Sequence, residues 1–82
     1  MRRQITIEVP ESMLLVQNTD AIAFADEIQM LAAVKLYELG RLSSSHAAEL
    51  AGISRVEFLL SLSRYKVFPL QSELTDLEQA YA

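Results

Sequence analysis

The segment Gln4–Val9 alternates strictly between apolar and polar residues. Its apolar side carries Ile5, Ile7 and Val9, and Pro10 ends the alternation. Such a pattern predicts a strand with one buried face. No other segment of the 82 residues alternates in this way, so the strand finds no partner within its own chain. We expect it to pair with the same strand of a second copy, which predicts a homodimer.

The composition also indicates that this chain needs a partner. Apolar residues make up 51% of the 82 residues, yet a domain of this size buries only roughly 60–65% of the surface that its unfolded chain exposes. Cysteine is absent and His46 is the only histidine, which excludes disulfides and an ordinary zinc site. We therefore expect no metal and no cofactor, and association is the remaining source of stability.

A long helix is predicted over residues 21–39, after a short helix over 11–16. Thr19 or Asp20 provides its N-cap, and Gly40 stands where a left-handed residue ends a helix. Its apolar residues form two opposed stripes, of which one would face the chain's own core and the other a second subunit. The first stripe is Ala21, Phe24, Ala25, Ile28, Ala32, Leu36 and Leu39; the second is Ala23, Met30, Ala33, Val34 and Tyr37. The predicted dimerisation residues are Ile5, Ile7, Val9, Met30, Val34 and Tyr37.

Two short helices joined by a glycine follow the long helix. Ser43 caps the first, over residues 44–51, and Ser54 caps the second, over roughly residues 55–65, as part of an S-x-x-E capping box. Ala48 and Gly52 match the small residue and the turn glycine of a helix-turn-helix.

The outward side of the second helix is a candidate DNA-reading surface. Its predicted DNA-binding residues are Ser54, Arg55, Ser61 and Arg64, and Arg55 at the helix start is placed for a base-edge or phosphate contact. Glu57 on the same side is unfavourable for DNA. A purely structural role for the two helices is the alternative.

The charge is unevenly distributed and leaves DNA binding open. The net charge is −4, but residues 35–66 carry five basic and three acidic side chains, or +2, whereas residues 1–34 and 67–82 each carry −3. The strand offers another route to DNA, because paired strands enter the major groove in ribbon-helix-helix proteins. Gln4, Thr6 and Glu8 would then face the groove. A strand that serves only dimerisation is the alternative.

The carboxyl-terminal segment has an apolar stripe of its own. Leu70, Leu74, Leu77 and Tyr81 recur at helical spacing, with acidic residues between them. About eleven residues are too few for a stable isolated helix, so this stripe predicts docking into a partner's groove or back onto the long helix. The sequence thus divides into residues 1–66, for dimerisation and the helix-turn-helix-like unit, and a partner-binding tail, 67–82.

Several classes of protein are disfavoured. No nucleophile, base and acid stand at a catalytic spacing, and no Gly-rich phosphate loop is present, so we expect neither an enzyme nor a small-molecule substrate. No apolar run is long enough to span a membrane, and no signal-peptide pattern opens the chain. A cytoplasmic protein is expected.

The chain resembles a prokaryotic family of small uncharacterised proteins, some of which are described as antitoxins. The residues that carry the resemblance are Ile5–Glu11, Ala32–Ser43, Ala47–Arg55 and Glu57-Phe58. The chain departs from the family pattern at Ser45-His46, where a glycine and a basic residue are more usual, at Val56, which replaces a bulkier aromatic, and at Lys66, which replaces a glycine.

The resemblance implies a DNA-binding-like helical module whose acidic tail contacts a cognate toxin, often a PIN-like ribonuclease. The expected function is therefore that of an antitoxin in a type II toxin–antitoxin pair. A stand-alone transcriptional regulator is the first alternative, and a helical adaptor that does not bind DNA is the second.

Overall fold

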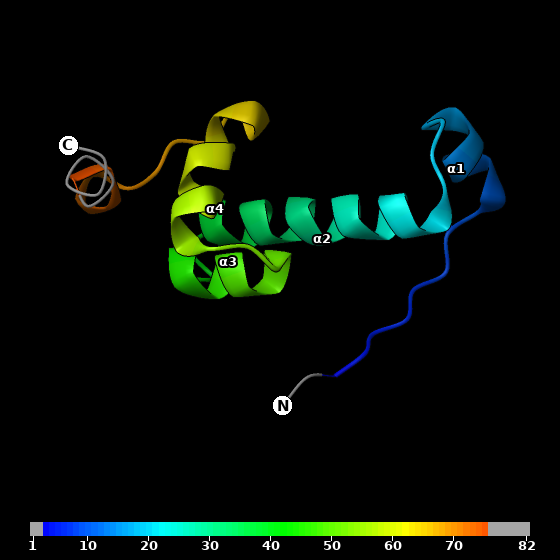
Figure 1. The fold of residues 1–82 in the computed structure, drawn as a ribbon, viewed down its shortest axis with the longest axis horizontal. Helices are drawn as coiled ribbons and strands as arrows, with labels where there is room; N and C mark the ends of the chain where they lie inside the picture. Colours follow the sequence, from blue (N-terminus) through cyan, green and yellow to red (C-terminus); the bar gives the residue numbers. More distant parts are fainter. Residues whose placement is uncertain (1–2, 76–82) are drawn as a thin grey trace.

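The computed structural model describes residues 3–75, and every regular element in that part of the chain is a helix. The elements are α1 (Glu11–Val16), α2 (Ala21–Glu38), α3 (Ser44–Ala51), α4 (Arg55–Ser61) and the 3-10 helix η1 (Leu62–Tyr65); residues 71–75 are also helical. The long helix α2 carries α1 at one end, and α3 and α4 pack at the other (Figure 1). The prediction of a mainly helical fold is confirmed. None of the described helices is long and apolar enough to cross a membrane.

The polar residues predicted to start three helices do so. Asp20 Oδ1 accepts a hydrogen bond from the Ala23 N–H at 2.9 Å, Ser43 Oγ accepts one from the backbone of His46 at 3.2 Å, and Ser54 Oγ accepts one from the backbone of Glu57 at 3.1 Å. Each bond satisfies an amide that the helix itself leaves unpaired. The segment predicted as one helix over 55–65 is α4 followed by η1.

Four of the helices end in the same way, on a residue with positive φ. These residues are Asn18 at 51°, Gly40 and Gly52 at 75°, and Lys66 at 59°. In each case the N–H of that residue donates to the carbonyl three residues back, and the next N–H donates to the carbonyl five residues back. This pair of bonds is the Schellman motif, which satisfies carbonyls at a helix end and turns the chain sharply.

The core lies at one end of the molecule, where α3, α4 and η1 pack on the last turns of α2. Its buried residues are Ala33, Val34, Tyr37, Ala47, Ala48, Phe58, Leu59, Leu62 and Val67, with Met30 partly buried against them. The second apolar stripe of α2 therefore faces this chain's own core. Val34 and Tyr37 are buried in this core. These two residues are therefore not available for the dimer contact that was predicted for them.

The amino-terminal half of the described chain has no core. None of residues 3–32 is buried, and the radius of gyration of 14.4 Å exceeds the about 12 Å typical of a compact domain of this length. Residues 3–10 have no regular secondary structure, so the predicted strand is not formed here. The physical reason is that a strand needs a neighbouring strand edge, and the described part of this single chain offers none.

Candidate functional site

The helices α3 and α4 form a tightly connected pair around Gly52. The Gly52 N–H donates to the Glu49 carbonyl at 3.2 Å and the Ile53 N–H donates to the Ala48 carbonyl at 3.0 Å. Ala48 is buried, which lets the neighbouring helices approach closely. Gln29 Nε2 of α2 also donates to the Leu50 carbonyl at 2.9 Å, so the pair is fixed to the long helix.

The two predicted DNA-binding residues at the start of α4 already have partners. The Ser54 hydroxyl caps the helix and donates to Glu57 Oε1 at 3.2 Å. Arg55 Nε donates to Ser44 Oγ at 2.9 Å, and its Nη2 lies 3.3 Å from Glu73 Oε2. The Arg55 side chain is 36% exposed, so part of its guanidinium is covered by the chain itself.

The other two predicted DNA-binding residues lie close together, Ser61 at the end of α4 and Arg64 in η1. Ser61 is buried; its hydroxyl donates to the Glu57 carbonyl at 2.7 Å and accepts a hydrogen bond from Arg64 Nη2 at 3.2 Å. The buried Ser61 hydroxyl therefore holds the Arg64 guanidinium in place and is not itself exposed to solvent. Arg64 is exposed and its guanidinium carbon lies 6.0 Å from the centre of the Tyr65 ring, a cation–π distance.

Glu73 links the tail to the helical core through a buried polar network. Its Oε1 accepts a hydrogen bond from the Tyr37 hydroxyl at 2.7 Å, while Oε2 pairs with Arg55. The Tyr37 hydroxyl in turn accepts a hydrogen bond from the Leu70 N–H at 3.0 Å. The carboxylate of Glu73 is thus held by residues of α2 and α4, and the network anchors the backbone at the start of the 71–75 helix.

Burial of Tyr37 raises the pKa of its hydroxyl above the ordinary value of 10.0. The hydrogen bond that it donates to Glu73 and the negative charge of that carboxylate act in the same direction, whereas the Leu70 N–H and the positive charge of Arg55 oppose them. The Tyr37 ring meets Phe58 edge to face, with ring centres 5.5 Å apart. The contact with Glu73 thus adds to the effect of burial on the pKa of Tyr37.

Two apolar side chains in the described part of the tail face solvent, although the Glu73 carboxylate is docked. Phe68 is 88% exposed and Leu70 is 64% exposed, and Leu74 is half-buried. Leu77 and Tyr81, the other two predicted partner-binding residues, lie outside the described residues. Phe68 was not predicted because it lies outside the Leu70, Leu74, Leu77 and Tyr81 stripe, between Val67 and Pro69.

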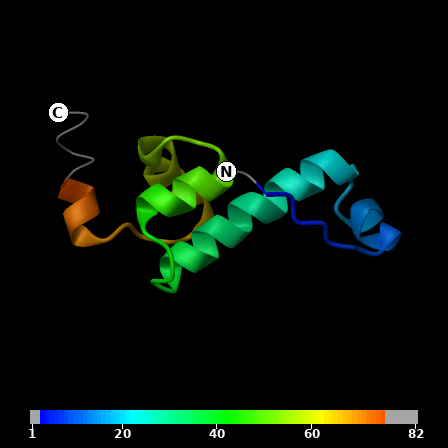
Figure 2. The same cartoon turned by 90° about the horizontal axis from the view of Figure 1, so that it is seen from below.

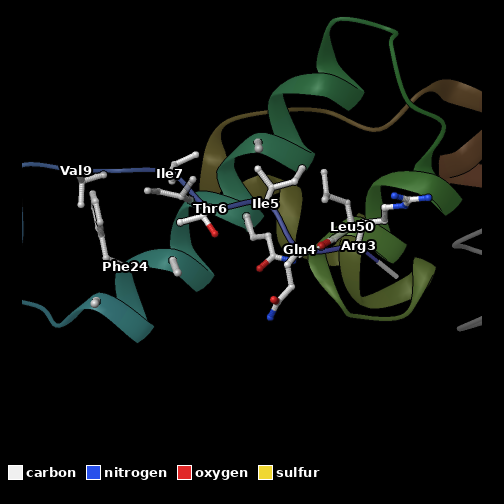
Figure 3. A pocket seen from close by; sticks show the side chains of 13 residues that line it. Arg3, Gln4, Ile5, Thr6, Ile7, Val9, Phe24 and Leu50 are labelled. Atoms are coloured by element: carbon white, nitrogen blue, oxygen red, sulfur yellow. Dashed lines mark hydrogen bonds between the residues drawn. The ribbon is translucent and has the colours of Figure 1, made fainter. Parts of the chain in front are cut away.

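An apolar cavity lies between the amino-terminal segment and α2. It has a volume of about 670 Å³, and Figure 3 shows Val9 and Phe24 at one end and Leu50 of α3 at the other. In the view of Figure 2 the amino-terminal segment overlaps α2, whereas Figure 1 shows that the segment diverges from α2 with distance from α1. The lining includes three of the predicted dimerisation residues and much of the first apolar stripe of α2, namely Ile5, Ile7, Val9, Ala21, Phe24, Ala25, Ile28 and Ala32.

The network around Glu73 could not be found from the sequence. Glu73 and Tyr37 are 36 residues apart, and Glu73 and Arg55 are 18 apart. Tyr37 belonged to an apolar stripe and Glu73 to a tail with several acidic residues, so no spacing singled them out. The Schellman turns at Gly40, Gly52 and Lys66 lie between Tyr37 and Glu73 in the sequence and redirect the chain three times.

The fold and these contacts define a small, mainly helical protein in which α3 and α4 are joined by a glycine turn and the Glu73 carboxylate is held by α2 and α4. The chain belongs to the Uncharacterised protein family (UPF0175), whose family model matches residues 1–82. Neither the curated proteins nor the solved structures contain a match to it.

Proposed function

We propose that this protein is a dimeric, DNA-binding antitoxin. Its tail, from Phe68 onward, binds a nuclease toxin, and the α3–α4 unit binds operator DNA. The observation that carries the proposal is the exposure of Phe68 and Leu70 directly after Val67, the last buried apolar residue before them. Large apolar side chains that the chain's own core does not use are suited to a partner's groove.

The DNA half of the proposal rests on the second helix and the charge around it. Arg64 is exposed beside the turn that ends at Lys66, and residues 35–66 carry a net charge of +2. Arginine and lysine side chains at such a surface contact DNA phosphates. A stand-alone transcriptional regulator, which would use the same helices but no toxin, is the second candidate, and a helical adaptor that does not bind DNA is the third.

Co-purification with the product of a neighbouring reading frame tests the toxin half. We expect a stable complex, seen by mass determination, that a Phe68→Ser, Leu70→Ser double variant fails to form. Leu60→Ser is the matched control, because Leu60 is an exposed leucine of α4 outside the tail. Equal capture by the tail variant and the control would contradict the toxin half, and DNA binding without any complex would favour the stand-alone regulator.

The DNA half is tested with duplex DNA from upstream of the reading frame, titrated at several salt concentrations. We expect Arg64→Ala to weaken binding to all sequences and to reduce the slope of log affinity against log salt by about 1. Binding as tight as that of the wild type, with the same salt slope, would contradict the assignment of Arg64 as a phosphate contact.

A further inference from the structure

The site that holds the Glu73 carboxylate is an anion site built from residues of three helices. Arg55 contributes Nη2 from the start of α4, Tyr37 contributes its hydroxyl from α2, and Ser44 of α3 fixes the guanidinium by accepting a hydrogen bond from Arg55 Nε at 2.9 Å. Tyr37 and Ser44 are buried. These groups therefore form a specific binding site for a carboxylate. The ion pair between Lys35 and Glu38, by contrast, lies on the surface.

Glu73 and a DNA phosphate compete for the same guanidinium. Glu73 covers Arg55, which lies at the start of the predicted DNA-reading helix. A phosphate that paired with Arg55 in place of Glu73 would leave the carboxylate without its cation, and an unpaired buried charge is costly. The Glu73 carboxylate must therefore leave its site when the Arg55 guanidinium binds another anion.

Departure of Glu73 also releases the tail backbone. The Tyr37 hydroxyl that donates to Glu73 is the same group that accepts the Leu70 N–H. Phe68 and Leu70 add little packing of their own, because both side chains are exposed. Residues 68–75 therefore undock when the ion pair between Arg55 and Glu73 breaks, and they dock again when it forms.

We propose that Arg55 has two mutually exclusive ligands, the carboxylate of Glu73 and a phosphate of the DNA backbone. A partner protein that takes up the tail then strengthens DNA binding, and DNA, by thermodynamic reciprocity, strengthens partner binding. This inference rests on the proposed function, since it gives the DNA-binding helix and the partner-binding tail a shared residue.

The test compares the DNA affinities of charge-matched variants by fluorescence anisotropy, with the upstream duplex and a random-sequence duplex. We expect Glu73→Gln to bind DNA roughly 5-fold or more tightly than the wild type, the lower end of typical coupling between sites. Glu38→Gln, which also removes one negative charge but from the exposed pair with Lys35, measures the general electrostatic gain. The gain in DNA affinity that Glu73→Gln produces should vanish when Arg55→Gln is added. In this double variant two neutral amides face each other.

A second variant releases the tail without changing the charge. Leu70→Pro removes the N–H that donates to Tyr37, so it should also tighten DNA binding. Resonances of the Tyr37 ring followed through an alkaline titration report the release. Loss of the hydrogen bond to Glu73 should lower the pKa of Tyr37 by more than loss of the Leu70 N–H raises it.

Two results would overturn the inference alone. One is DNA binding that is equally tight in Glu73→Gln, Leu70→Pro and Glu38→Gln. The other is a Tyr37 pKa in Leu70→Pro that is no lower than in the wild type, since other contacts would then hold the tail. Absence of DNA binding by every variant at low salt would contradict the proposed DNA-binding function itself, and the inference with it.

Discussion

Lys66 holds the left-handed conformation that ends η1, with φ of 59°. For a residue with a Cβ this conformation costs about 1–2 kcal/mol, whereas glycine adopts it without strain but loses roughly 0.5–1 kcal/mol more backbone entropy on folding. We therefore expect Lys66→Gly to raise the free energy of unfolding by about 0.5–1 kcal/mol, measured by chemical denaturation.

Gly52→Ala is the matched control for this prediction. Gly52 has the same role at the end of α3 with φ of 75°, and an added Cβ there would meet no atom within 4 Å. Its substitution therefore adds conformational strain and no clash, and it should lower the free energy of unfolding by about 1 kcal/mol. A destabilised Lys66→Gly variant would contradict the account of strain at the end of η1.

The helix pair α3–α4 depends on small residues where the helices approach the core. Ala48 is 2% exposed, and the core around it is filled by Phe58, Leu62 and the other buried residues. We expect Ala48→Leu to lower the free energy of unfolding by about 1–3 kcal/mol, because the added methyl groups have no space. Thermal or chemical denaturation measures the loss. Ser45→Leu places the same side chain on the exposed side of α3 and should change stability by less than about 0.5 kcal/mol.

The elements differ in how far the sequence determines them. Asp20, Ser43, Ser54 and Gly52 act through bonds to residues at most five positions away, so local patterns were sufficient to place the helices. The inward stripe of α2 was ambiguous because both stripes are apolar, and only packing against α3 and α4 decides between them. The strand predicted at residues 4–9 is not formed, because a strand needs a neighbouring strand edge and the described part of the chain offers none; no local pattern reveals that absence.

The whole molecule is divided into a half with a core and a half without one. Ile5 is 88% exposed and Ile7 is 59% exposed, and both line the open apolar cavity on α2. We expect the protein to be a dimer in sedimentation experiments at micromolar concentration, and Ile7→Lys to shift it to a monomer, because a charge cannot be buried unpaired in the interface.

Thr6→Lys is the control for the dimer prediction. Thr6 is the neighbouring residue on the polar side of the alternation, so the same added charge should leave the dimer intact. A monomeric wild type would contradict the dimer, and a dimeric Ile7→Lys variant would contradict the role of the amino-terminal segment in it.

None of residues 3–32 is fully buried within the chain, whereas the end of the molecule around Phe58 and Leu62 has a core of its own. If the expected dimer and the proposed partner form, the stability of the first half depends on the concentration of both. We then expect limited proteolysis to cut this half faster in dilute protein than in concentrated protein.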